Sequence, residues 1–109
     1  MSERKRRIAR NEEIFRRVNE QIEQVNLAFG EVAGSMTLVC ECGDSACIEQ
    51  IEVTPEEYQR LRADPTMFAV KPGHEISDVE DVVEELDRYW IVKKHEGDPA
   101  EVARELADS

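Results

Sequence analysis

Three cysteines are the residues of this chain whose type and spacing most clearly indicate chemistry. Cys40, Cys42 and Cys47 are the only cysteines, and they fall within eight residues, Cys-Glu-Cys-Gly-Asp-Ser-Ala-Cys. Zn²⁺ prefers four donors in a tetrahedron, and thiolates are among its usual ligands. The Gly43-Asp44 pair favours a turn that would direct the three sulfur atoms to one point. The spacing therefore predicts a metal site that needs a fourth ligand.

The fourth ligand is predicted to be one of the two histidines of the chain. His74 directly follows the turn-forming pair Pro72-Gly73, which would hold its backbone in place. His95 stands at the end of a predicted strand, where a solvated side chain is the default. Because a ligand needs an ordered, oriented backbone, His74 is favoured and His95 is the alternative. Glu41 and Asp44 are further donors, but sites with three thiolates are most often completed by Cys or His.

The identity of the metal leaves two alternatives open beside zinc. Thiolates also hold iron–sulfur clusters, so a Cys₃His cluster is the first alternative. Redox-active or unliganded cysteines are the second. A disulfide would leave one thiol over, and a catalytic cysteine paired with His74 would leave two unexplained. A structural zinc ion bound by Cys40, Cys42, Cys47 and His74 accounts for all three thiols.

The cysteine segment resembles a motif of a known enzyme family. Cys40 to Cys47 is similar to the C-x-C-x₄-C zinc knuckle that follows the catalytic domain of many SET-domain methyltransferases. In that family the cysteines bind zinc with a distant fourth ligand, which implies zinc here. A chain of 109 residues has no room for a SET domain, so the resemblance implies no methyl transfer. Most of the chain also resembles a family of small, uncharacterised bacterial proteins, through Arg10-Asn11-Glu12, Val18-Asn19-Glu20, the cysteine segment, Ile51 to Tyr58, Pro72-Gly73-His74 and Tyr89 to Val92.

The elements that must position these residues predict an α+β fold. We expect a long N-terminal helix, followed by a small zinc-stabilised antiparallel β module with one short helix. The predicted organisation is a basic arm and amphipathic helix over residues 1–30, the zinc-binding module over 36–96, and a flexible C-terminal tail over 97–109. Within that tail, Asp98-Pro99 can start a short helix that runs to Leu106.

The N-terminal helix is predicted over Ile8 to Phe29, with Gly30 as its stop. Its apolar stripe recurs at three- and four-residue steps and comprises Ile8, Phe15, Val18, Ile22, Val25 and Phe29, with Asn11 in the same register. Ile14 and Leu27 widen the stripe. A buried Asn at such a position suits register selection between paired helices. We therefore expect a homodimer or a protein partner on this helix, the alternative being that the stripe packs on the β module.

The remaining elements follow from local signals. Strands are predicted over residues 36–39, 48–53 and 67–70. Thr54-Pro55-Glu56-Glu57 has the pattern of a helix start with a capping box, and Asp64-Pro65 ends that helix. The segment Ser77 to Leu86 has both helical spacing and β-branched residues. Only Asp87-Arg88 separates it from the strand Tyr89 to Val92, so an antiparallel hairpin is favoured over a helix.

Charge is unevenly distributed in this acidic chain. The net charge is −11, yet seven of the 14 basic residues lie within positions 1–17. A basic arm on an acidic body can contact nucleic acid or an acidic partner, but the acidic remainder would repel phosphate. The acidic pairs Glu12-Glu13, Glu56-Glu57 and Glu84-Glu85 are interpreted as solvated faces.

The function predicted from these features is a zinc-stabilised protein-interaction or regulatory module. The alternatives are a nucleic-acid-associated protein that uses the basic arm, and a metal or redox sensor that uses the Cys₃His cluster. The sequence has no phosphate-binding Gly loop and no His-Glu-x-x-His helix, so an enzyme is not expected. It also has no apolar run long enough to span a membrane and no signal-peptide core, which predicts a cytoplasmic protein.

Overall fold

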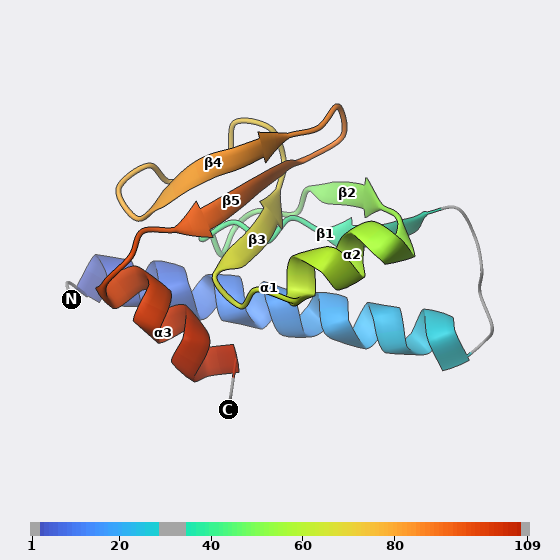
Figure 1. Cartoon of the computed structure of the whole chain (residues 1–109), viewed down its shortest axis with the longest axis horizontal. Helices are drawn as coiled ribbons and strands as arrows, with labels where there is room; N and C mark the ends of the chain where they lie inside the picture. The colour runs from blue at the N-terminus through green and yellow to red at the C-terminus, as the bar shows by residue number, and fades with distance from the viewer. Residues whose placement is uncertain (1–2, 29–34, 108–109) are drawn as a thin grey trace.

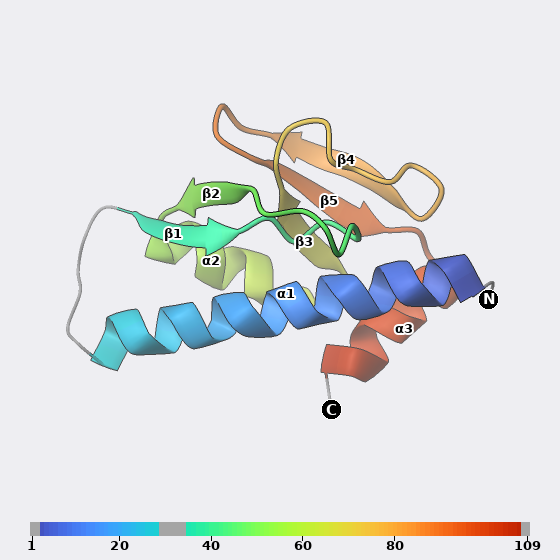
Figure 2. The ribbon, with the colours of Figure 1, turned by 180° about the vertical axis from the view of Figure 1, so that it is seen from behind.

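The computed structural model describes residues 3–28 and 35–107. Its elements, in chain order, are α1 (Glu3–Ala28), β1 (Met36–Val39), β2 (Gln50–Val53), α2 (Pro55–Arg62), β3 (Met67–Val70), β4 (Glu80–Glu85), β5 (Trp90–Lys94) and α3 (Asp98–Ala107). Helix α1 runs along the long axis of the molecule beneath the strands, and α2 and α3 lie in front of it in Figure 1 and behind it in Figure 2. The α+β fold with a long N-terminal helix agrees with the prediction.

The strands form two small antiparallel sheets. β1 pairs with β2, with Met36 opposite Val53, and the second sheet has the order β3-β5-β4. The hairpin predicted for β4 and β5 is confirmed, and Leu86 N–H donates to Tyr89 O at 2.9 Å to close it. The β4–β5 register shifts between Val82 and Glu84, as at a β-bulge. β5 is therefore the central strand, and it leads directly into α3.

Helix α2 begins as its sequence predicts. Thr54 Oγ1 accepts a hydrogen bond from Glu57 N–H at 3.1 Å, and Glu57 Oε1 accepts one from Thr54 N–H at 2.7 Å. Pro55 occupies the first helical position, where its missing N–H costs nothing. This reciprocal capping box fixes the direction of the helix, so that Tyr58 and Leu61 are buried.

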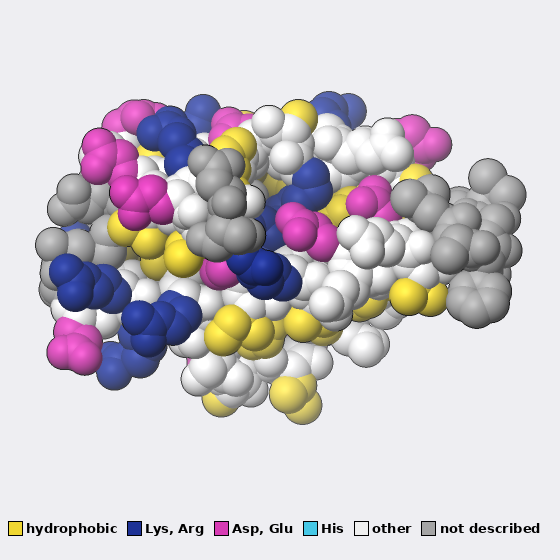
Figure 3. Space-filling model, turned by 90° about the horizontal axis from the view of Figure 1, so that it is seen from below, with side chains coloured by type: hydrophobic (Ala, Val, Ile, Leu, Met, Phe, Trp, Pro, Cys, Tyr) yellow, Lys and Arg dark blue, Asp and Glu magenta, His cyan; other side chains and the backbone are white. Residues whose placement is uncertain are grey.

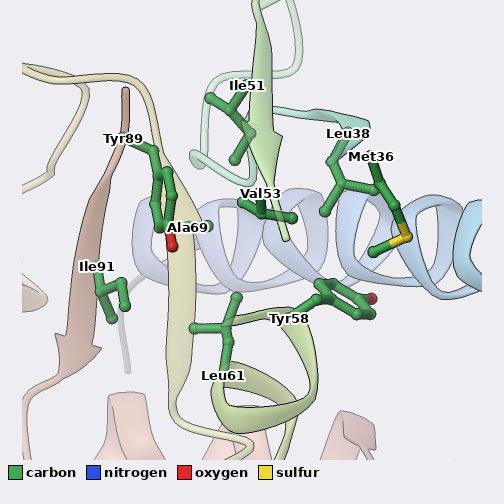
Figure 4. Packing of buried hydrophobic residues seen from close by; sticks show 9 residues of the cluster. All are labelled: Met36, Leu38, Ile51, Val53, Tyr58, Leu61, Ala69, Tyr89 and Ile91. Atoms are coloured by element: carbon green, nitrogen blue, oxygen red, sulfur yellow. The ribbon is translucent and has the colours of Figure 1, made fainter. Parts of the chain in front are cut away.

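The main apolar core lies between the β1–β2 pair, α2 and the second sheet (Figure 4). Alternate residues of the short strands point into it, as expected for strands with one buried face. Tyr58 of α2 is 0% exposed, and burying an apolar side chain of comparable size stabilises a fold by about 1.5–3 kcal/mol. The core comprises Met36, Leu38, Ile51, Val53, Tyr58, Leu61, Ala69, Tyr89 and Ile91, with Ile22 of α1 packed against it.

The face of α1 that contacts the body carries charged and polar side chains beside Ile8 and Ala9, which the sequence did not predict. Glu12 and Asn19 are 0% exposed, and Glu13 and Arg16 are also buried. The interpretation of Glu12-Glu13 as a solvated pair is therefore wrong. Glu13 pairs with Arg16 and Arg17, and Arg16 also donates to Pro65 O at 2.7 Å, so the buried charges are neutralised by partners.

The predicted apolar stripe of α1 divides between two environments. Ile8 is buried, and Ile22 is partly buried against the main core. Val18 and Val25 are 37% and 54% exposed. Phe29 and Gly30 lie outside the described residues, as do the side chains of Leu27 and its neighbours. The helix thus packs on the body with only part of the stripe.

Among the described helices, α1 included, none combines the length and the apolar character that crossing a bilayer requires.

The C-terminal segment is a packed helix rather than a flexible tail over its described part. The short helix expected from Asp98 is present as α3, and it extends to Ala107. Ala100 and Ala103 are 0% and 3% exposed, and Arg16 Nη2 donates to Ala103 O at 3.2 Å. The small side chains let α3 approach α1 closely, so residues 98–107 belong to the body of the fold.

Candidate metal centre

The four predicted ligands come together in the structure. The ligand atoms of Cys40, Cys42, Cys47 and His74 all lie within 4.8 Å of one another. His74 Nδ1 is 3.6 Å from the Sγ atoms of both Cys40 and Cys47. Cys40 and Cys42 are buried, whereas Cys47 and His74 are partly exposed. This Cys₃His group could hold a metal ion, and it lies at the junction of both sheets and α1.

The loop between β1 and β2 brings the cysteines to one point. Cys40 N–H donates to Glu49 O at 3.0 Å and extends the β1–β2 ladder into the loop. Asp44 then closes a turn, because its carboxylate accepts from Ala46 N–H at 2.9 Å and its carbonyl from Cys47 N–H at 3.0 Å. Side-chain oxygens of this kind stabilise turns without help from sheet or helix.

Gly43 contributes to the loop through close packing. A Cβ atom at this position would lie 2.5 Å from Cγ2 of Ile8 and 2.9 Å from Cδ1 of Ile76. Asn11 Nδ2 donates to the carbonyl of Gly43 at 2.9 Å. Gly43 therefore lets the loop lie directly on α1. Asn11 anchors the loop there through this hydrogen bond.

His74 is positioned by a turn in which a glycine, Gly73, adopts a positive φ. His74 N–H donates to Lys71 O at 2.9 Å across Pro72-Gly73, and Gly73 has φ = 88°. Proline followed by glycine with positive φ is the pattern of a type II turn. Lys71 N–H donates to Sγ of Cys40 at 3.1 Å. The same short turn thus places one ligand and hydrogen-bonds to another.

Replacement of Gly73 by alanine should weaken metal binding. No atom would crowd the new Cβ, so the cost is backbone strain at positive φ, about 1 kcal/mol. Relief of that strain would shift His74, and we expect metal affinity to fall about tenfold. Gly97→Ala is the matched control, because Gly97 has φ = 98° and equally open space. Competition with a chromophoric chelator measures both variants; equal affinities would contradict the positioning role of Gly73.

Glu41 lies between two ligands but belongs to a different network. Its carboxylate accepts from Arg62 Nη2 at 2.7 Å, from Asn19 Nδ2 at 2.8 Å and from Ala69 N–H at 3.0 Å. The side chain is fully buried. Neighbouring residues of an extended chain point to opposite sides, so Glu41 faces away from the sulfur atoms on either side of it. The alternation Cys-Glu-Cys is the sequence signal for this arrangement.

Asn19 connects α1 to the strand that enters the loop. Its side chain accepts from Val39 N–H and donates to Val39 O, both at 2.9 Å. The amide thus pairs with the backbone as a neighbouring strand would. Because Asn19 also donates to Glu41, the helix, the strand and the cysteine loop share one buried network.

His95, the alternative ligand, lies outside the Cys₃His group. Its ring Nε2 is 3.1 Å from Oδ1 of Asp81, and its backbone N–H donates to Val79 O at 2.8 Å. Over residues 3–28 and 35–107, no other group of His, Cys, Asp and Glu was found that could hold a metal ion. The geometry therefore favours His74 over His95.

The thiols influence one another's protonation. A hydrogen bond from Cys42 lowers the pKa of the Cys40 thiol, and the same bond raises the pKa of Cys42. Burial raises the pKa of Cys47. Without a metal, Cys42 and Cys47 therefore hold their protons more tightly than ordinary thiols do, and an incoming cation must displace them.

Comparisons with models of protein families, with curated proteins and with solved structures gave no match.

Proposed function

We propose that this protein is a zinc-stabilised protein-interaction module. In this proposal a structural zinc ion fixes the Cys40–Cys47 loop and the His74 turn on α1, and the outward side of α1 binds a protein partner. The observation that carries the proposal is the convergence of four protein ligands, Cys40, Cys42, Cys47 and His74, on one point.

The distances between the ligand atoms support zinc. Bonds of about 2.3 Å to sulfur and about 2.0 Å to nitrogen give a tetrahedron whose sulfur–nitrogen edges are about 3.5 Å. In the structure, the distances from His74 Nδ1 to Sγ of Cys40 and to Sγ of Cys47 are both 3.6 Å, close to this value. Three thiolates and one imidazole are also a common ligand set of structural zinc sites.

The ligand count and the surface favour interaction over catalysis. Four protein ligands fill a tetrahedron, whereas catalytic zinc keeps a position open for water or substrate. A structural ion instead contributes folding free energy, which a 109-residue chain with short strands needs. Ile14, Val18 and Val25 of α1 are 37–54% exposed and provide apolar contact area.

Co-purification with surface variants tests the interaction role. Tagged wild-type chain and the double variant Val18→Glu/Val25→Glu would be recovered from native lysate with their zinc content measured. We expect partners, further copies of the chain included, to be lost from the variant while zinc is retained. Ile48→Glu is the control, since Ile48 is 91% exposed in the cysteine loop. An identical set of partners for wild type and both variants would contradict the proposal.

One observation favours a metal or redox sensor as a second candidate. A hollow of about 300 Å³ opens beside the site and is lined in part by Cys42 and His74. Cys47 is itself partly exposed, so solvent solutes can approach one of the thiols. Iron in the site, with visible absorbance, would favour this candidate over the structural role.

A further inference from the structure

The exposed side of α1 carries a row that we call the outer stripe, made of three apolar residues, Ile14, Val18 and Val25, together with Gln21. These residues follow three- and four-residue steps and lie opposite the buried polar face of the helix. A hollow of about 260 Å³ is lined by Val18, Gln21, Ile22 and Val25. In Figure 3 hydrophobic side chains gather along the underside of the molecule, beside a group of Lys and Arg side chains.

We propose that the outer stripe is covered by α1 of a second copy of this chain, packed antiparallel. This inference rests on the proposed interaction function and specifies its partner. The outer stripe is exposed, whereas the opposite face of α1 already packs on the body; an exposed apolar row of this kind is the pattern of a helix that has a second protein surface to contact.

The charges of α1 suit an antiparallel pair. The centre of the outer stripe lies midway between Ile14 and Val25. Arg10 lies on one side of this centre, and Ala28, the last residue of the helix, lies on the other side. Their distances from the centre along the helix axis differ by only about 1.5 Å. Each Arg10 would therefore lie beside the last turn of the partner helix. That turn has no basic residue of its own, and its carbonyl groups carry partial negative charge.

A parallel pair would lack this complementarity. Arg10 of each chain would face Arg10 of the other, and the exposed Arg7 one turn earlier would add a second repulsive pair. Four side chains per helix form a small contact, so we expect dissociation constants in the micromolar range, on the order of 10–100 μM.

Sedimentation velocity on the zinc-loaded full chain tests the pairing. We expect the mass to rise with concentration towards twice the 12.5 kDa of one chain. Val25→Glu should raise the dissociation constant at least about tenfold, because it places a carboxylate in the apolar contact. Val83→Glu is the matched control: Val83 is 51% exposed, close to the 54% of Val25, but lies on β4. Helix content and bound zinc are measured for each variant.

Arg10→Gln tests the orientation. In the antiparallel pair this substitution removes two favourable contacts with helix ends and should weaken association about threefold to thirtyfold. In a parallel pair it would relieve repulsion and strengthen association, which would overturn the proposed orientation.

The outcomes separate this inference from the function on which it rests. A wild-type chain that binds zinc but stays monomeric at about 1 mM would overturn the pairing, whether or not it binds another protein or duplex DNA. The interaction function would still stand if Val18→Glu/Val25→Glu lost other partners. Unchanged partners in that double variant would instead contradict the function itself.

Discussion

Replacement of Cys42 by serine is expected to abolish tight zinc binding and to unfold most of the chain. Structural zinc contributes about 10–16 kcal/mol in small zinc-binding peptides, and a domain of this size has a net stability of only about 5–15 kcal/mol. Cys42 is 2% exposed and lies in a core cluster with Cys40 and Phe68, so the loss of this ligand also disturbs the packing around it. Far-ultraviolet circular dichroism during heating measures the effect.

The size of the loss distinguishes a metal ligand from a buried thiol. Without a metal, the same substitution would cost about 1–3 kcal/mol, the price of burying a hydroxyl with poor partners. Ser45→Ala is the control, because Ser45 is exposed in the same loop and is not a ligand. If Cys42→Ser unfolds within a few degrees of wild type and keeps its metal, Cys42 is not a ligand.

Lys94→Met is expected to lower the free energy of unfolding by about 3–5 kcal/mol at neutral pH. Lys94 is 3% exposed, and its ammonium contacts the buried carboxylates of Glu12 and Glu80, at 3.1 Å from the latter. Methionine has a similar volume but no charge, so two carboxylates would remain in the interior without a cation. Urea denaturation of zinc-loaded protein gives the free energy directly.

The neighbouring lysine provides the control for this charge. Lys93 has a side chain that is 40% exposed, and its Nζ is 3.4 Å from Asp64. Such a surface pair contributes at most about 1 kcal/mol, so Lys93→Met should have little effect. Equal losses for the two variants would show that the buried pairing with Glu12 and Glu80 has no special importance.

The free energy of unfolding should depend on pH through Glu12, the carboxylate that Lys94 contacts together with Glu80. Burial raises the pKa of Glu12 well above its ordinary 4.5, and the neighbouring Glu80 raises it further, against the opposing effect of Lys94. The folded state therefore holds this proton more tightly than the unfolded state does. The stability from Glu12 is fully present below pH 4.5 and is lost as pH rises through the folded pKa. Glu12→Gln should remove this slope while other titrations stay the same, and an unchanged slope would contradict it.

The sequence predicts the Cys₃His group well because its signals are local. Cys40, Cys42 and Cys47 lie within one loop, and the Pro72-Gly73 turn directly precedes His74. The capping box of α2 and the β4–β5 hairpin are likewise predicted from residues that are close together in the sequence, and the structure contains both. In each case chain geometry limits the available arrangements before any tertiary contact forms.

The interface between α1 and the body is not predictable from such signals. Glu12, Glu80 and Lys94 lie on three elements from opposite ends of the chain, and only the folded structure brings them together. Apolar periodicity predicts that the stripe containing Val18 and Val25 is covered, by a partner or by the β module, but it gives no sign that Glu12 and Asn19 are buried. Periodicity identifies an apolar face but not what covers it, because a buried polar face with matched partners leaves no apolar signature.

Elemental analysis of the purified full-length chain, together with its absorption spectrum, tests the metal centre most directly. We expect one zinc ion per chain and no visible absorbance, because zinc has a filled d shell. Treatment of the same sample with a chelator should remove both the zinc and the folded structure. Iron with visible absorbance, or a folded chain that contains no metal, would contradict a structural zinc ion bound by Cys40, Cys42, Cys47 and His74.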